Sequence, residues 1–185
     1  DAVRADQPAV VCGLSMGGYV ALAFYRRHRA RVAGLILAAT RAGADSPEAQ
    51  AGRDRMAQTA REHGAGAVAE AMLPKLFAPA AYAARPELVA GARPMLAGAS
   101  VDGIVSALAA LRDRPDSTPR LAEITVPTLV IHGTDDQLIP PAEAEKMAAG
   151  IPGAALRLIA GAGHLLNLEQ PAAFNAAVSD FMLSL

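Results

Sequence analysis

The stretch that decides the fold is AVVCGLSMGG, which covers residues 9–18. Its first four residues form a short apolar run that Gly13 ends, and such a run predicts a strand buried on both faces. From Met16 to His28 the apolar residues recur at helical spacing, with basic residues near the end, where cations suit the helix dipole. The sequence therefore predicts a strand and a helix joined by a sharp turn at Ser15.

This turn also carries a recognisable chemical pattern. Gly13-Leu14-Ser15-Met16-Gly17 matches G-x-S-x-G, which between a strand and a helix is typical of a nucleophilic serine. A turn this sharp needs neighbours without side chains, so we expect a Cβ atom at Gly13 or Gly17 to collide with the adjacent backbone. The free backbone N–H of Met16, at the start of the helix, can stabilise negative charge on a carbonyl oxygen. The alternative is an ordinary turn between a strand and a helix.

The remaining strand-like runs indicate an α/β fold. Residues 32–38 form a second apolar run shortly after the first helix, which predicts a strand–helix–strand unit with parallel strands. Runs at 127–132 and 155–159 predict two further strands, each followed by a helix, the last from Pro171 to about Leu183. We therefore expect one domain with a mostly parallel sheet.

The segment of residues 40–119 has a different character. It consists of Ala-rich amphipathic pieces separated by prolines, without a strand-like run, and this pattern predicts a helical insertion. Helix starts are expected where a capping residue or a proline opens a first turn, at Ser46-Pro47, Arg85-Pro86 and Ser100. The chain is thereby divided into a core of residues 1–39 and 120–185 and a cap of residues 40–119.

A serine hydroxyl is a weak nucleophile unless an imidazole removes its proton, so the four histidines are compared. His28 and His63 lie in helical, solvated settings, and His132 closes a strand, where a packed residue is expected. His164 follows the Gly161-Ala162-Gly163 turn after the last strand, at the rim where open parallel sheets place their sites. His164 is therefore the best candidate for the base.

The imidazole in turn needs a carboxylate to orient it. The turn after the strand at 127–132 offers Asp135 and Asp136, which cannot both point the same way. One of the two is expected to be a turn-forming residue that bonds its own backbone.

Three parts of the chain together resemble the α/β-hydrolase superfamily: the elbow at 13–18, the segment 127–136 with Pro140, and the segments 161–164 and 169–171. The serine, the acid and the histidine also follow one another in that family's order. The resemblance covers nearly all of the chain and implies an α/β-hydrolase fold, with a mostly parallel sheet and a helical cap insertion.

The resemblance also implies the roles of the site residues. The family's acid lies three residues after the glycine that ends the strand, which maps onto Asp136, leaves Asp135 as a turn residue and makes Asp45 the weaker alternative. Ser15 would attack the substrate, His164 would carry the proton and Asp136 would fix the imidazole tautomer. Neither a metal nor a cofactor is required.

Within the superfamily, the chain is most similar to the 3-oxoadipate enol-lactonase and carboxylesterase branch. This similarity implies a serine hydrolase for a small-molecule ester, lactone or related carbonyl compound. Serine at position 15 argues against haloalkane dehalogenases and most epoxide hydrolases, which place Asp there. A C–C bond hydrolase or a cofactor-free perhydrolase with the same triad is the alternative among enzymes, and an inactive or ligand-binding fragment is the noncatalytic alternative.

One departure from the family pattern concerns the beginning of the chain. The family's first strands, and the loop with the second oxyanion donor, normally precede the elbow by many tens of residues, whereas here the elbow begins at Gly13. The chain is thus similar to the C-terminal two-thirds of such an enzyme. Eight apolar cap residues are candidates to line its substrate pocket, with plain helix packing as the alternative: Met56, Met72, Leu73, Leu76, Phe77, Tyr82, Met95 and Leu96.

The composition of the chain argues against several classes of binding partner. The 17 basic and 18 acidic residues nearly balance, which argues against binding to nucleic acid or an anionic membrane. Cys12 is the single cysteine and cannot close an internal disulfide, and zinc-type Cys/His spacing is absent from the sequence.

No apolar stretch approaches the roughly 18 residues of a membrane span, and the N-terminus lacks a signal-peptide pattern, so we expect a cytoplasmic location. The oligomeric state stays open.

Overall fold

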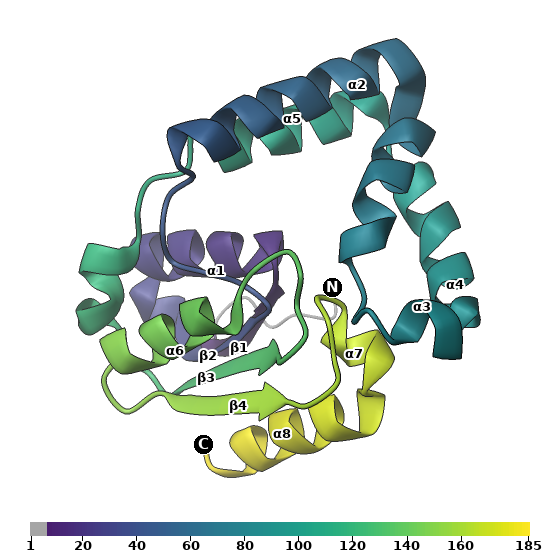
Figure 1. Ribbon diagram of the computed structural model, residues 1–185. Helices are drawn as coiled ribbons and strands as arrows, with labels where there is room; N and C mark the ends of the chain where they lie inside the picture. Colours follow the sequence, from purple (N-terminus) through teal and green to yellow (C-terminus); the bar gives the residue numbers. More distant parts are fainter. Residues whose placement is uncertain (1–6) are drawn as a thin grey trace.

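A sheet of four parallel strands forms the centre of the computed structural model, which describes residues 7–185 (Figure 1). The strands lie in the order of the chain: β1 (Ala9–Leu14), β2 (Val32–Ala38), β3 (Thr128–Gly133) and β4 (Ala155–Ile159). One row of paired residues crosses all four strands, through Cys12, Ile36, Leu129 and Ala155. Because the strands are parallel, their carboxyl ends meet at one edge of the sheet. The predicted α/β fold with a parallel sheet is confirmed.

Helices cover both faces of this sheet (Figure 1). Helices α1 (Met16–Arg27) and α6 (Pro141–Gly150) pack on one face, and α7 (Leu166–Glu169) and α8 (Pro171–Leu183) pack on the other. Side chains alternate along a strand, so Leu35 and Leu37 join the first core while Ile36 joins the second. The continuous apolar run in β2 therefore reflects burial on both faces.

The prediction that β1 is buried on both faces is wrong. Ala9 and Cys12 are exposed, and Val10 and Val11 are half-buried. In the described part of the chain β1 is hydrogen-bonded to β2 alone and forms an edge of the sheet, whereas β2 and β3 each have two neighbours. An apolar run predicts a strand, but it does not by itself place that strand in the middle of a sheet.

The segment between β2 and β3 is helical, as predicted. It contains α2 (Pro47–Met72), the short 3₁₀ helix η2 (Leu73–Lys75), α3 (Ala81–Ala84), α4 (Pro86–Ala97), α5 (Val101–Arg112) and a second 3₁₀ helix, η3 (Thr118–Glu123). A further 3₁₀ helix, η1 (Arg29–Arg31), precedes β2. The expected starts of α2, α4 and α5 are confirmed, and the hydroxyl groups of Ser46 and Ser100 accept from the backbone N–H three residues on. Helix α2 breaks at Gly64, where φ is 79°, and its first part lies beside α5 (Figure 1).

Hydrogen bonds tie this helical segment to the sheet. The buried carboxylate of Glu169 accepts from the backbone N–H of Ala78 at 2.8 Å and from that of Gly163 at 2.7 Å. The N–H of Leu165 donates to the carbonyl of Leu76 at 2.9 Å. Burial raises the pKa of Glu169, although both N–H donors oppose the shift. The loop after β4 is thereby held against the helical segment.

None of the helices in residues 7–185 is by itself long and apolar enough to cross a membrane. Helices α4 and α5 meet that criterion of length and composition only as a pair, which is bent by 96°.

Candidate active site

Three loops at the carboxyl edge of the sheet bring a serine, a histidine and an aspartate together. Ser15 follows β1, Asp136 follows β3 and His164 follows β4. The Nε2 atom of His164 lies 2.8 Å from the Ser15 Oγ, and its Nδ1 lies 2.8 Å from the Asp136 Oδ2. Because an ionised carboxylate only accepts, Nδ1 carries a proton and Nε2 is left to accept from the serine hydroxyl. This arrangement suits nucleophilic catalysis.

The backbone of Ser15 is held in an uncommon conformation. Its φ is 53° and its ψ is −113°, a region that residues with a Cβ rarely adopt. The Ser15 N–H donates to the carbonyl of Ala38 at 2.8 Å, and its carbonyl accepts from the Thr40 hydroxyl at 2.8 Å. Strain at a site that the surroundings fix this firmly is typical of a functional residue.

Two glycines make this turn sterically possible, but they are not quite the predicted pair. A Cβ atom at Gly13 would lie 2.2 Å from the carbonyl oxygen of Gly17, as expected. A Cβ atom at Gly17 would meet nothing within 4 Å, so the predicted collision there is wrong. It is Gly18 that lacks room, since its Cβ would lie 2.4 Å from the Cγ2 of the buried Thr40.

These contacts predict different changes in stability for alanine at positions 17 and 18. Gly18→Ala should lower the free energy of unfolding by about 1–3 kcal/mol, because the added methyl displaces Thr40 and its bond to Ser15. Gly17→Ala should leave it unchanged or raise it by up to about 1 kcal/mol, because the space is open and alanine favours a helix. Urea unfolding of the two variants measures the difference, and equal losses would show that Thr40 does not limit position 18.

The backbone N–H of Met16 is available beside Ser15. Met16 is the first residue of α1, so its N–H has no partner within the helix. Met16 lines the same cavity as Ser15, and its N–H lies at the positive end of the 12-residue helix α1. This placement suits the predicted oxyanion donor.

Asp136 is buried and well supplied with donors. Its Oδ1 accepts from the backbone N–H of Leu138 at 2.8 Å and of Ile139 at 3.0 Å, while Oδ2 faces His164. Burial alone would raise the pKa of Asp136, but the hydrogen bonds from His132 and His164, the electrostatic attraction between the carboxylate and the His164 ring, and the Ile139 N–H outweigh it and hold the pKa well below its usual range. The carboxylate therefore stays ionised near neutral pH.

His132 is a site residue that sequence reasoning missed. It is fully buried, and its Nε2 lies 2.9 Å from the carbonyl oxygen of Ile139 and 3.2 Å from the Asp136 Oδ2. The expectation of a packed strand-end residue is correct for its burial, but that expectation overlooked the contact with the acid. The spacing of four residues between His132 and Asp136, across the end of β3, is the signal that was available in the sequence.

Asp45, the alternative acid, does not contact His164. Its buried carboxylate is bound instead by the guanidinium groups of Arg41, Arg53 and Arg114. Burial would raise the pKa of Asp45, but the hydrogen bonds from Arg114 and Arg53 lower it on balance. The alternative assignment is therefore wrong.

The other titratable candidates lie away from Ser15. Asp135 is exposed and accepts from the Thr134 hydroxyl at 3.0 Å, as a turn residue would. His63 is exposed beside Glu62 on α2, and His28 ends α1 with its ring 4.9 Å from that of Phe24. No cluster of His, Cys, Asp or Glu side chains in residues 7–185 could hold a metal ion.

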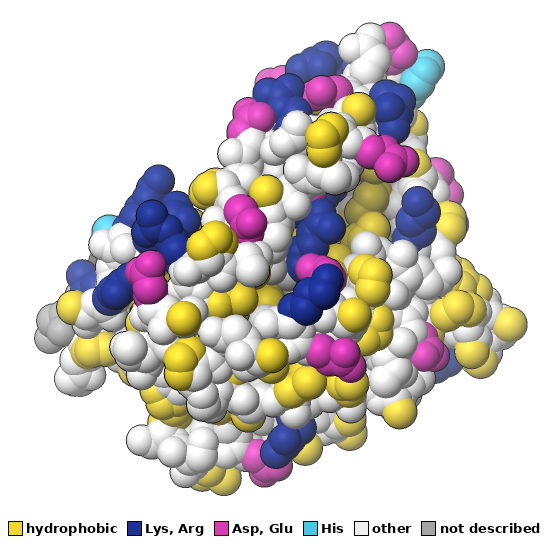
Figure 2. Space-filling view, turned by 60° about the vertical axis from the view of Figure 1, so that its left-hand side comes forward, with side chains coloured by type: hydrophobic (Ala, Val, Ile, Leu, Met, Phe, Trp, Pro, Cys, Tyr) yellow, Lys and Arg dark blue, Asp and Glu magenta, His cyan; other side chains and the backbone are white. Residues whose placement is uncertain are grey.

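A cavity of about 350 Å³ lies beside Ser15, between the edge of the sheet and helices α2 and α5. Figure 2 shows the molecule hollowed beneath its upper helices, with basic side chains next to hydrophobic ones. Of the eight cap residues named as candidate lining, Met72 alone lines this cavity. Leu73, Leu76 and Phe77 pack into a core of the helical segment, and Met95 is 76% exposed.

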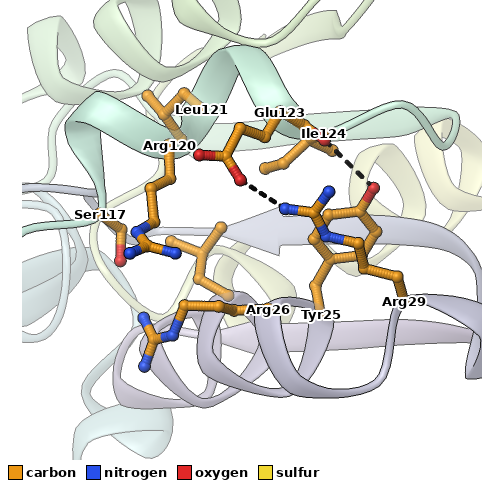
Figure 3. Close-up of a pocket in the computed structure, with 9 residues that line it drawn as sticks. Tyr25, Arg26, Arg29, Ser117, Arg120, Leu121, Glu123 and Ile124 are labelled. Atoms are coloured by element: carbon orange, nitrogen blue, oxygen red, sulfur yellow. Dashed lines mark hydrogen bonds and ion pairs between the residues drawn. The ribbon is translucent and has the colours of Figure 1, made fainter.

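A second hollow, between α1 and η3, has no catalytic group (Figure 3). It measures about 20 Å³, roughly the space of one water molecule. Its Arg29 is paired with Glu123, as the dashed line shows. The larger cavity beside Ser15 is the candidate substrate site.

A parallel sheet with a serine elbow and a Ser–His–Asp arrangement at its carboxyl edge defines the class of α/β hydrolases. The family model described as "Alpha/beta hydrolase family" matches residues 1–177, and the chain belongs to this family.

Among curated relatives, 3-oxoadipate enol-lactonase 2 of Acinetobacter baylyi is 35% identical over 178 residues, which cover 94% of this chain and 63% of that enzyme. A 2-hydroxy-6-oxononadienedioate/2-hydroxy-6-oxononatrienedioate hydrolase of Dechloromonas aromatica is 30% identical over 98% of this chain and 64% of its own. A solved thermophilic esterase from Thermogutta terrifontis, with malate bound, is 42% identical with a TM-score of 0.93, over 96% of this chain and 65% of the esterase. The chain thus spans just under two-thirds of the length of these relatives.

Proposed function

We propose that this protein is a serine hydrolase that cleaves small-molecule esters or lactones through an acyl-enzyme on Ser15. One observation carries the proposal: the hydrogen-bonded chain from Ser15 through His164 to the ionised Asp136, at 2.8 Å for each link, beside a cavity of about 350 Å³. The names of the lactonase and esterase relatives support the same reaction class.

The geometry accounts for each step of such a reaction. The Ser15 Oγ attacks the carbonyl carbon while its proton passes to the His164 Nε2, and the Met16 N–H stabilises the oxyanion. His164 then returns the proton to the departing alkoxide, which leaves an ester on Ser15. Water repeats the sequence and releases the acid, while Asp136 stabilises the imidazolium in both halves.

A C–C bond hydrolase is the second candidate, because several relatives are named 2-hydroxy-6-oxononadienedioate/2-hydroxy-6-oxononatrienedioate hydrolases and one of them aligns with 98% of this chain. The same serine, base and acid would then act on a carbon–carbon bond next to a ketone. Rates on an aryl ester and on a vinylogous 1,5-diketone, compared on the same preparation, separate the two candidates.

A fluorophosphonate probe tests the proposal without knowledge of the substrate. Its phosphorus is attacked by the activated Ser15 Oγ and fluoride leaves, so intact mass spectrometry should find one adduct, and peptide mapping should place it on Ser15. The exposed Ser106 on α5 should stay unmodified. A purified protein that neither reacts with the probe nor hydrolyses p-nitrophenyl butyrate would contradict the proposal and favour an inactive or ligand-binding role.

A further inference from the structure

Two arginines line the cavity beside the nucleophile. Arg41 lies in the loop after β2 and Arg53 lies on α2, and both contribute to the wall that contains Ser15. About a quarter of each arginine side chain is exposed, 26% for Arg41 and 25% for Arg53. Among the described residues that line this cavity, none is acidic.

Within residues 7–185, the ion pairs made by these arginines leave positive charge unbalanced. Asp45 is the carboxylate that holds them: its Oδ1 accepts from Arg41 and, at 2.9 Å, from Arg114, and its Oδ2 accepts from the Arg53 Nε at 3.0 Å. Three guanidinium groups thus share one carboxylate, which leaves an excess of two positive charges. Such an excess beside a partly enclosed cavity attracts an anion, because the low surrounding dielectric screens it poorly.

The arginines also retain unused donors. Arg53 reaches Asp45 through Nε, and its two terminal nitrogens donate to no residue within 7–185. Arg41 uses one terminal nitrogen, and its buried Nε has no partner in that range. The buried Nε of Arg114 also has no partner in that range, but its two terminal nitrogens donate to backbone carbonyls and its guanidinium stacks 4.2 Å from the centre of the Tyr19 ring. Arg114 is thus committed to the fold, whereas Arg41 and Arg53 can still bind a ligand.

We propose that the substrate carries a carboxylate, which Arg41 and Arg53 bind while the ester or lactone carbonyl lies at Ser15. Planar guanidinium groups with parallel N–H donors match the planar oxygen pair of a carboxylate. Asp45 acts as a positioning residue that fixes both arginines from behind. The inference rests on the proposed function, since it places the anion beside the nucleophile.

Pairs of esters that differ only in this charge test the proposal. Mono-p-nitrophenyl glutarate is compared with its methyl ester, which places the charge on the acyl side. Then 4-acetoxybenzoate is compared with methyl 4-acetoxybenzoate, which places it on the leaving group. In one of the pairs the anion should have the higher kcat/KM by about tenfold to a hundredfold, the range expected for hydrogen bonds to a charged group.

The variants Arg53→Gln and Arg41→Gln should each reduce this anion-to-neutral ratio about tenfold. Each leaves Asp45 with two guanidinium partners, so the buried carboxylate stays neutralised. Arg55→Gln is the matched control, because Arg55 is exposed on the same helix and does not line the cavity. Its ratio should equal that of the unaltered protein.

Calorimetry of glutarate binding to the Ser15→Ala protein tests the proposed anion site without turnover. Binding that Arg53→Gln weakens would support the anion site even if the protein failed to react with a fluorophosphonate, in which case the proposed function alone would fall. Equal rates within both ester pairs, together with a glutarate affinity that neither arginine substitution changes, would overturn the proposed anion site. The proposed hydrolase function would not be affected by this result. Arg41 and Arg53 would then serve only to neutralise Asp45.

Discussion

Ser15→Ala should reduce kcat for p-nitrophenyl butyrate by about 10⁴- to 10⁶-fold, because no other hydroxyl lies within hydrogen-bond distance of the His164 Nε2 in residues 7–185. The substitution removes the atom that would form the proposed acyl-enzyme and leaves the cavity and the Met16 N–H in place. What remains is the smaller acceleration from binding and the oxyanion donor. Initial rates measured from the release of p-nitrophenolate give the loss directly.

The control is Ser106→Ala, which removes an exposed hydroxyl from α5 and should keep the parental rate. Unfolding midpoints of both variants should stay close to that of the parent, because the Ser15 turn is held by backbone bonds and by Thr40 rather than by the Oγ atom. Near-parental turnover by a folded Ser15→Ala protein would exclude Ser15 as the nucleophile.

Much of the fold is predictable from short-range patterns. The apolar runs at β2 and β4 and the capped starts of α2 and α5 coincide with the elements in the structure, because capping and hydrophobic periodicity act over a few residues. The exposure of Cys12 was not predictable in this way. It depends on which strands flank β1, and no local pattern encodes a neighbour that is distant in the sequence.

The candidate site, like the fold, was predictable from local sequence patterns only in part. The G-x-S-x-G turn and the loops after β3 and β4 single out the residues that the structure brings together, because each marks the carboxyl end of a strand in a parallel sheet. Asp45 also follows a strand and looked like a rival acid. Its true partners include Arg53 and Arg114, which lie eight and 69 residues further along the chain, so only the packed fold reveals its role.

Asp136→Asn should lower kcat by about 10³- to 10⁴-fold with little change in overall fold, because it reverses the hydrogen bonding of His164. The Oδ1 position accepts two backbone N–H groups, so the amide oxygen of the new side chain should stay there and its NH₂ should take the Oδ2 position. That NH₂ would face the His164 Nδ1, which must then give up its proton. The proton moves to Nε2, and the imidazole can no longer accept from Ser15.

Asp135→Asn provides the matched control, because it makes the same chemical change at the adjacent position, where the side chain is exposed and contacts Thr134. Its kcat should stay within about twofold of the parent, since surface changes away from a site have little effect. Circular dichroism and unfolding midpoints would show whether the Asp136 variant is folded when its rate is measured. The opposite ranking of the two variants would move the acid to Asp135. Equal, small losses would mean that the imidazole keeps its tautomer without a carboxylate, which the 2.8 Å contact between Asp136 and His164 argues against.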